Sequence, residues 1–272
     1  MASPAASKLR ELLADESKIV ACPGVYDGLS ARVALQAGFD ALYMTGAGTT
    51  ASRLGQADLG VITLNEMCET AGMIANLDRC TPVIADADTG FGGSLMVHRT
   101  VLQYIRAGVA ALHLEDQVLA KRCGHLRNKQ LVPEPEFLSR IKAASIKRLK
   151  SAVELGADVA FLEGVRSKEE ARRVCQDLHP VPVLFNAVAG GLSPDLSIEE
   201  AQKLGFRLII FPGFALGPTI AALTTAAKHL KETGSLEVTG ELSPQALFTV
   251  VGLHEALAID AASGAGLFQD GV

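Results

Sequence analysis

The sequence has no excess of basic residues, because 25 lysines and arginines stand against 30 acids and give a formal net charge of −5 at pH 7. It therefore offers no electrostatic reason to expect nucleic acid or a membrane as a partner. It also lacks any apolar run of roughly 18 residues, the length that a membrane-spanning helix needs. Residues 1–18 have neither the apolar region of a signal peptide nor the composition of a transit peptide. We expect a cytoplasmic protein, in which local cations or a metal could still bind a small anion.

Paired cysteines are missing as well. The five cysteines are widely spaced and form no CxxC pair, which argues against a structural zinc or a redox couple. Four have apolar neighbours and are predicted to be small buried side chains: Cys22, Cys68, Cys80 and Cys175. Cys123 differs, because Lys121, Arg122 and His125 surround it. Positive neighbours predict a lowered thiol pKa, as an acid–base cysteine requires. The alternative is an exposed cysteine without a role.

Short apolar runs alternate with helical patterns along the chain. Seven runs are predicted to be strands: 19–24, 41–46, 82–88, 111–116, 159–164, 182–188 and 208–213. The intervening segments have apolar residues at helical spacing, and several end in glycine as a helix C-cap would. Continuous apolar strands separated by helices indicate a parallel sheet covered on both faces. We expect one α/β domain over 1–272, a TIM-type (β/α) barrel with seven of the eight strands, and C-terminal helices that pack on a neighbour.

Polar side chains are concentrated at the C-terminal ends of these strands, where barrels and open α/β sheets place their sites. Asp86 and Asp88 lie one residue apart on a predicted strand, so their side chains should point to the same face and converge on a hard cation. Glu115 follows the next strand, and three acids favour Mg²⁺, with Mn²⁺ as the alternative. The alternative interpretation is a solvated strand end without a metal. Glu163 and Asn186 could likewise be helix N-caps rather than site residues.

Three segments together carry a resemblance: DADTGFGG (86–93), HLED (113–116) and KRCGH (121–125). The chain resembles the isocitrate lyase and phosphoenolpyruvate mutase superfamily, most closely its 2-methylisocitrate lyase, dimethylmalate lyase and oxaloacetate acetylhydrolase branch. The resemblance covers nearly the whole chain. It implies a Mg²⁺-dependent barrel that assembles as a homotetramer and exchanges its last helices between subunits. It also implies a lyase or hydrolase that cleaves a carbon–carbon bond of a small 2-hydroxy or 2-oxo di- or tricarboxylic acid through an enolate.

The same resemblance implies roles for individual residues. Cys123 would be the general acid and base on a mobile loop, and His125 and Glu163 would join it at the catalytic site. The substrate would be bound by Tyr43, Thr45, Gly46, Ala47, Asp86, Gly124 and Asn186. The metal would be held, directly or through water, by Asp86, Asp88 and Glu115, with Asp58, Lys121 and Arg122 in support.

One part of the family pattern is missing. Members carry a fifth strand that ends in an Arg-Thr-Asp-like motif, whose arginine binds the substrate carboxylate beside the metal. Here residues 134–158 read as one long amphipathic helix, so about one βα unit is absent near Ser145. Two alternatives therefore stay open. One is the phosphonomutase chemistry of the same superfamily, which KRCGH disfavours, and the other is an inactive barrel variant that lacks the substrate-binding arginine.

Overall fold

Seven parallel strands form the centre of the protein. The computed structural model describes residues 4–144, 157–236 and 243–264, and its strands follow the order β4-β3-β2-β1-β7-β6-β5. They are β1 Val20–Val25, β2 Leu42–Met44, β3 Val83–Asp86, β4 Ala111–His113, β5 Ala160–Phe161, β6 Val183–Asn186 and β7 Leu208–Phe211. Each strand lies in a predicted apolar run, so the expectation of a seven-stranded α/β barrel fold is confirmed. The runs are longer than the strands, because their polar ends leave the sheet as loops.

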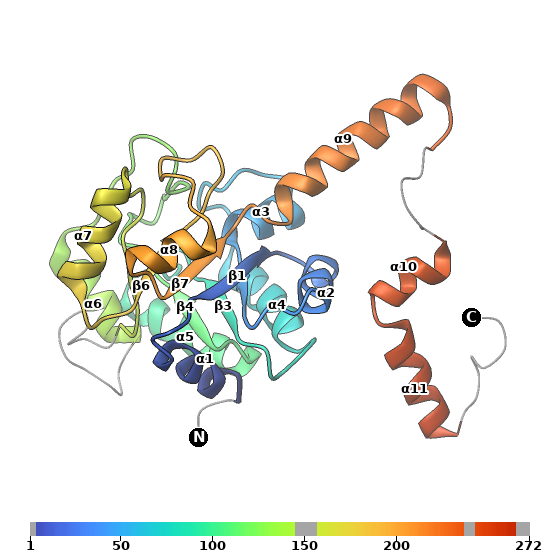
Figure 1. Cartoon of the computed structure of the whole chain (residues 1–272), viewed down its shortest axis with the longest axis horizontal. Helices are drawn as coiled ribbons and strands as arrows, with labels where there is room; N and C mark the ends of the chain where they lie inside the picture. The colour runs from blue at the N-terminus through green and yellow to red at the C-terminus, as the bar shows by residue number, and fades with distance from the viewer. Residues whose placement is uncertain (1–3, 145–156, 237–242, 265–272) are drawn as a thin grey trace.

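The sheet curls into an incomplete barrel whose edges are β4 and β5 (Figure 1). No strand of the described residues pairs with both of these edges. The ring of His113, at the end of β4, instead meets the ring of Phe161 in β5 edge-on, with 4.9 Å between the centroids. Side chains rather than backbone hydrogen bonds therefore connect the two edges at this point.

Helices follow the strands in the alternating pattern that the sequence predicts (Figure 1). They are α1 Pro4–Ala14, α2 Gly28–Gln36, α3 Gly46–Leu54, α4 Leu64–Ala75, α5 Ser94–Ala107, α6 Glu134–Ala144, α7 Lys168–Leu178, α8 Ile198–Leu204, α9 Leu216–Thr233, α10 Pro244–Val250 and α11 Leu253–Ser263. The helix expected over 134–158 begins as α6. Its continuation through 145–156 lies outside the described residues.

Side chains of the strands alternate between the barrel interior and the helical layer, as a strand's period of two requires. Leu208 and Ile210 of β7 belong to the interior cluster, whereas Ile209 between them packs with α7 and α8. Tyr43 and Ile84 from neighbouring strands also lie in the interior cluster. This alternation directs alternate side chains at the C-terminal strand ends toward one shared space.

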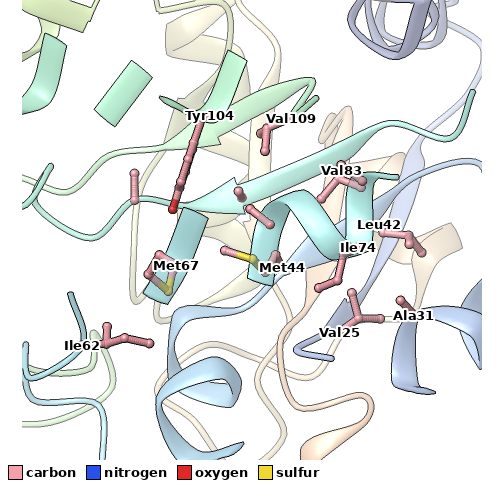
Figure 2. Packing of buried hydrophobic residues seen from close by; sticks show 14 of the residues in the cluster. Val25, Ala31, Leu42, Met44, Ile62, Met67, Ile74, Val83, Tyr104 and Val109 are labelled. Atoms are coloured by element: carbon pink, nitrogen blue, oxygen red, sulfur yellow. The ribbon is translucent and has the colours of Figure 1, made fainter. Parts of the chain in front are cut away.

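The largest cluster fills the space between the first three strands and the helices that cover them (Figure 2). Met44 of β2 and Met67 of α4 are fully buried there, together with Tyr104 of α5. The Tyr104 hydroxyl donates a 2.6 Å hydrogen bond to the backbone carbonyl of Asp86. The core thus fixes the end of β3, where the polar residues begin.

The three C-terminal helices bury little of their own surface. Helix α9 extends away from the sheet and has no buried residue, although Ile220, Leu223 and Leu230 are apolar (Figure 1). Helix α11 is tied to α2 by an ion pair of 2.8 Å between Arg32 and Glu255. Among the described helices none alone is long and apolar enough to cross a membrane, and only α10 with α11, bent by 83°, reaches that composition as a pair.

The predicted burial of four cysteines is only partly confirmed. Cys22 and Cys175 are buried, and Cys68 is half-buried with its thiol 3.2 Å from the side-chain oxygen of Gln103. The prediction is wrong for Cys80, which is exposed. Its backbone N–H is held by Asp78 in the surface turn between α4 and β3, so its apolar neighbours in sequence do not cover it.

Candidate metal centre and active site

Three carboxylates converge at the C-terminal ends of β3 and β4, and we call Asp86, Asp88 and Glu115 the acid cluster. One oxygen from each lies within 4.8 Å of the others. The prediction that strand alternation brings Asp86 and Asp88 together is wrong, because β3 ends at Asp86 and Asp88 has a left-handed backbone with φ of 45°. The Asp88 N–H instead donates to the Asp86 side chain at 2.9 Å, and this turn brings the two carboxylates together.

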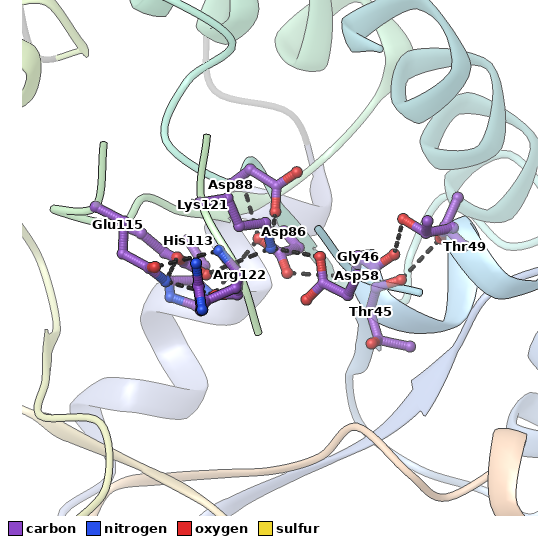
Figure 3. Close-up of polar contacts among 12 residues, drawn as sticks. Thr45, Gly46, Thr49, Asp58, Asp86, Asp88, His113, Glu115, Lys121 and Arg122 are labelled. Carbon is purple, nitrogen blue, oxygen red and sulfur yellow. Dashed lines mark hydrogen bonds and ion pairs between the residues drawn. The ribbon is translucent and has the colours of Figure 1, made fainter. Parts of the chain in front are cut away.

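Asp86 is positioned by the start of α3 (Figure 3). Its Oδ2 accepts hydrogen bonds from the Tyr43 hydroxyl at 3.3 Å and from the Gly46 N–H at 3.2 Å. A side chain at Gly46 would place its Cβ 2.7 Å from that oxygen, so only glycine permits the approach. Thr45 caps α3 by accepting from the Gly48 N–H, and Ala47 is half-buried in the same turn. These predicted substrate-binding residues therefore do lie beside the acid cluster.

Burial disfavours the charged forms of the carboxylates in the acid cluster. Burial, followed by the charge of Asp86, raises the pKa of Asp88 to about 7, and the same two causes raise the pKa of Glu115 to about 7. Oxygen-only donors of this kind are the ligands that Mg²⁺ and Mn²⁺ prefer. The acid cluster could therefore hold a divalent metal, which would compensate carboxylates that water no longer solvates.

Lys121 places one positive charge against these acids (Figure 3). Its side chain is 1% exposed, and its Nζ lies 2.6 Å from Asp58, 2.5 Å from Asp88 and 4.0 Å from Glu115. Burial opposes the charge of this ammonium, but the surrounding carboxylates, Asp86 foremost, raise its pKa above the ordinary value. Lys121 and Asp58 thus lie where the sequence predicted supporting residues.

The segment 117–131, which we call the cysteine loop, starts and ends at the same place. Gln117 and Leu131 form an isolated antiparallel bridge, so the base of the loop is closed. Inside the loop the Cys123 N–H donates to the Asp58 carbonyl at 3.0 Å, and the Lys129 ammonium donates to the Gly124 carbonyl at 2.6 Å. The predicted catalytic cysteine is therefore anchored next to a residue that contacts Lys121.

The predicted direction of the Cys123 pKa is wrong. Burial is the largest influence, and it raises the pKa of the thiol above its ordinary value, although the His125 backbone N–H and Lys121 act in the opposite direction. The Arg122 guanidinium donates to the Arg127 carbonyl at 3.2 Å. Sequence proximity overstated the positive surroundings, because the charges are engaged with other groups.

A second polar group joins the cysteine loop to the opposite side of the barrel. His125 Nε2 lies 3.3 Å from Glu163, and the Asn186 amide donates to the same carboxylate at 3.0 Å. The Leu192 N–H donates to His125 Nδ1, which leaves Nε2 to carry the proton toward Glu163. Burial acts to raise the pKa of Glu163, but the nearby His125 ring and the hydrogen bond from Asn186 outweigh it and hold the pKa below its ordinary value. A Cβ at Gly124 would lie 2.9 Å from the Glu163 side chain.

Neither acid nor amide in this second group is a helix cap. Ser167 caps α7, the helix after Glu163, and Ser197 caps α8, the helix after Asn186. The structure therefore favours the interpretation of Glu163 and Asn186 as members of a shared site over the capping alternative.

Two neighbours of the acid cluster were not predicted as site residues. His113 ends β4, and its Nδ1 lies 3.3 Å from the Tyr43 hydroxyl and 3.9 Å from Asp86. Gln117 is buried and donates to Glu115 at 2.7 Å. The place of His113 at the C-terminal end of a strand is a signal that could have identified it. Gln117 lies in the loop beyond β4, where no local signal in the sequence marks it.

Known proteins match this chain over most of its length. The family model described as phosphoenolpyruvate phosphomutase matches residues 9–145 and 143–231. A 2,3-dimethylmalate lyase from Eubacterium barkeri is 40% identical over 232 positions, which cover 76% of this chain and 79% of the relative. A crystal structure of 2,3-dimethylmalate lyase has a TM-score of 0.94 at 50% identity and covers 100% of this chain and 99% of its own.

A structure of oxaloacetate acetylhydrolase with the inhibitor 3,3-difluorooxalacetate has a TM-score of 0.93 at 45% identity and covers 98% of this chain and 100% of its own. The dimethylmalate lyase structure is itself described as a member of the PEP mutase/isocitrate lyase superfamily. The family match and both structures agree with the resemblance carried by the three sequence segments. This chain belongs to the phosphoenolpyruvate phosphomutase family of the PEP mutase/isocitrate lyase superfamily.

Proposed function

We propose that this chain is a divalent-metal-dependent lyase or hydrolase that cleaves a carbon–carbon bond of a small 2-hydroxy or 2-oxo di- or tricarboxylic acid. The observation that carries the proposal is the buried convergence of Asp86, Asp88 and Glu115 beside a loop that carries Cys123. The likeness to a dimethylmalate lyase and an oxaloacetate acetylhydrolase supports this chemistry. Mg²⁺, or Mn²⁺, held by the acid cluster would supply positive charge to stabilise an enolate.

The chain's own residues would bind the acid and handle the proton. In the first turn of α3, which runs from Thr45 to Ala47, the Ala47 N–H would bind a substrate carboxylate, because the Thr45 and Gly46 N–H groups donate to Val25 and Asp86. Tyr43 lies beside this turn and also contacts Asp86. Cys123 keeps its proton at neutral pH because burial raises its pKa, so the thiol is suited to donate a proton to the carbon freed by bond cleavage. The cysteine loop would exclude water meanwhile.

The group formed by His125, Glu163 and Asn186 would line the far side of the substrate. The Leu192 N–H bond to His125 Nδ1 sets the tautomer of this ring, so the group offers one defined arrangement of donors and acceptors. Gly124 packs on Glu163, so closure of the cysteine loop and the shape of this side depend on each other.

The absent βα unit stays a prediction, and two observations support it. The family match is split into two parts that meet at residues 143–145. The alignment with the Eubacterium barkeri lyase has 232 positions but covers only 76% of the 272 residues of this chain, which is about 207 residues. The remaining positions, about 25, are therefore gaps in this chain. The inactive barrel variant is therefore the second candidate function, because a missing strand removes the arginine that the resemblance assigns to the substrate carboxylate.

We also propose a homotetramer in the cytoplasm, without nucleic acid or membrane as a partner. The exposed apolar side chains of α9, among them Ile220 and Leu223, support burial against another subunit. Light scattering after size-exclusion chromatography is expected to give a tetramer mass, and a monomer at micromolar concentration would contradict this assembly.

An assay across candidate acids tests the proposed reaction. Purified protein with Mg²⁺ would be supplied in turn with oxaloacetate, 2-methylisocitrate, dimethylmalate and isocitrate, while release of a 2-oxo acid or oxalate is followed. Turnover of one of these acids is the expected result. Phosphonopyruvate is assayed in parallel, and its turnover without turnover of any of the four acids would favour the phosphonomutase alternative. A folded protein that turns over none of the five substrates would favour the inactive variant.

Metal affinity is expected to rise as pH increases from about 6 to 8. Cation binding requires the ionised carboxylates, whereas Asp88 and Glu115 have pKa values of about 7 and hold protons below it. Calorimetric titration with Mg²⁺ at several pH values would show proton release on binding. An affinity that does not change across this range would contradict the assignment of these two acids as ligands.

The free energy of unfolding of the metal-free protein should also depend on pH. A carboxyl whose pKa is higher in the folded than in the unfolded state binds more protons when folded. The free energy of unfolding should therefore fall as pH rises from about 4 toward 7 through Asp88 and Glu115. Chemical denaturation with and without Mg²⁺ measures the free energy of unfolding at each pH. At pH 8 the bound metal should restore the stability that the metal-free protein has lost.

A further inference from the structure

The side chain of Gln117 makes three hydrogen bonds at the base of the cysteine loop. Its Nε2 donates to Glu115 Oε2 at 2.7 Å and to the Arg122 carbonyl at 2.8 Å, and its Oε1 accepts from the Arg122 N–H at 3.3 Å. The residue is 4% exposed. One neutral amide thus connects a carboxylate of the acid cluster to the peptide groups immediately before Cys123.

The backbone of Gln117 is itself fixed. It forms the bridge with Leu131, and its carbonyl accepts a 2.8 Å hydrogen bond from the buried guanidinium of Arg140 in α6. The Val118 N–H donates to the Gln130 carbonyl at 2.9 Å. The backbone of Gln117 is therefore held on both sides. Its side-chain amide can fix Glu115 relative to the peptide groups of Arg122 without moving with either.

The direction of these bonds is specific. Because the Gln117 amide donates to Oε2 of Glu115, the carboxylate is oriented with Oε1 on the side of Lys121, at 4.0 Å. A neutral donor orients the carboxylate without adding charge to the acid cluster. The paired bonds to the peptide groups of Arg122 hold the next residue, Cys123, where its N–H reaches Asp58.

We propose that Gln117 is a positioning residue that couples the acid cluster to the cysteine loop. It sets the orientation of Glu115 for a divalent cation and holds the loop segment that carries Cys123 over the site. The first half deepens the proposed function, on which it rests. Partners that orient metal ligands typically change metal affinity by about 10–100-fold when they are replaced, and we expect an effect of that size here.

Replacement of Gln117 by leucine, which has a similar size but no amide, tests both halves. Mg²⁺ affinity is measured by calorimetry, and the alkylation of Cys123 by iodoacetamide in metal-free protein is followed by mass spectrometry. We expect Mg²⁺ to bind about tenfold more weakly or worse, and Cys123 to be alkylated severalfold faster.

Lys129→Met is the matched control. The Lys129 ammonium bonds to the Gly124 carbonyl inside the cysteine loop and has no contact with Glu115 in the described structure. This variant should speed alkylation of Cys123 and leave Mg²⁺ affinity unchanged. If it weakens Mg²⁺ binding as much as Gln117→Leu does, order of the loop rather than the Gln117 amide controls the metal site, and the proposal is overturned.

The remaining outcomes separate the two proposals. Gln117→Leu with wild-type Mg²⁺ affinity and alkylation rate would overturn the role of Gln117. Wild-type protein that binds no Mg²⁺ would instead overturn the proposed metal function, while the alkylation rates would still test the loop half. If the leucine variant fails to fold, Gln117→Asn keeps an amide on a shorter side chain, and wild-type behaviour in it would likewise contradict the proposal.

Discussion

Replacement of Cys123 by serine is expected to lower turnover by about 10²–10⁴-fold, the usual contribution of a positioned acid or base. The variant should retain Mg²⁺ affinity, because Cys123 contacts the Asp58 backbone rather than a side chain of the acid cluster. Steady-state rates and calorimetry on the same preparation measure the two quantities.

Cys80→Ser is the control for this experiment. Cys80 is exposed in the turn between α4 and β3, so its replacement should change neither turnover nor Mg²⁺ affinity. A Cys123→Ser variant with wild-type turnover would remove the thiol from the mechanism, whereas a large fall in both turnover and metal affinity would show that the substitution disturbs the site.

Replacement of Lys121 by methionine is expected to destabilise the metal-free protein by about 3–5 kcal/mol at pH 8, since loss of one partner leaves buried charges uncompensated. Methionine fills similar space but leaves Asp58 and Asp88 without their ammonium contacts. Two treatments should reverse the loss. Saturating Mg²⁺ supplies another positive charge, and a pH near 5.5 protonates the carboxyls whose pKa values are raised.

Lys168→Met provides the comparison for Lys121→Met. The ion pair of Lys168 with Glu200 is exposed on both sides, so its removal should cost about 0–1 kcal/mol regardless of Mg²⁺. Denaturant unfolding of the three proteins at both pH values gives the result. If Lys121→Met is equally destabilised at pH 5.5, at pH 8 and with Mg²⁺, Lys121 acts by packing rather than by charge.

Apolar runs and glycine-terminated helices are local signals, and they predicted the seven parallel strands and the helices between them. The acid cluster was also predictable, because consecutive strand ends of a barrel meet at one edge. Its internal geometry was not. Asp88 reaches Asp86 through a left-handed turn, which the spacing of two residues could not distinguish from a strand.

The environment of Cys123 shows why sequence proximity fails for electrostatics. Lys121 and Arg122 are its neighbours in sequence, yet one contacts buried acids and the other a loop carbonyl. Burial, which depends on how the cysteine loop folds back over the barrel, is then the largest influence on the pKa of the Cys123 thiol. Gln117 was missed for a related reason, since an amide acquires its role only from the three partners that folding brings to it.

Under the proposed function, the acid cluster holds a divalent cation that carbon–carbon cleavage requires. The most direct measurement is turnover of metal-stripped protein during titration with Mg²⁺, on the substrate found in the panel assay, alongside calorimetric occupancy of the site. We expect turnover to be absent after the metal is stripped and to rise in proportion to occupancy. Turnover that persists without a divalent cation, or its absence at full occupancy for every acid of the panel, would rule out this role of the acid cluster.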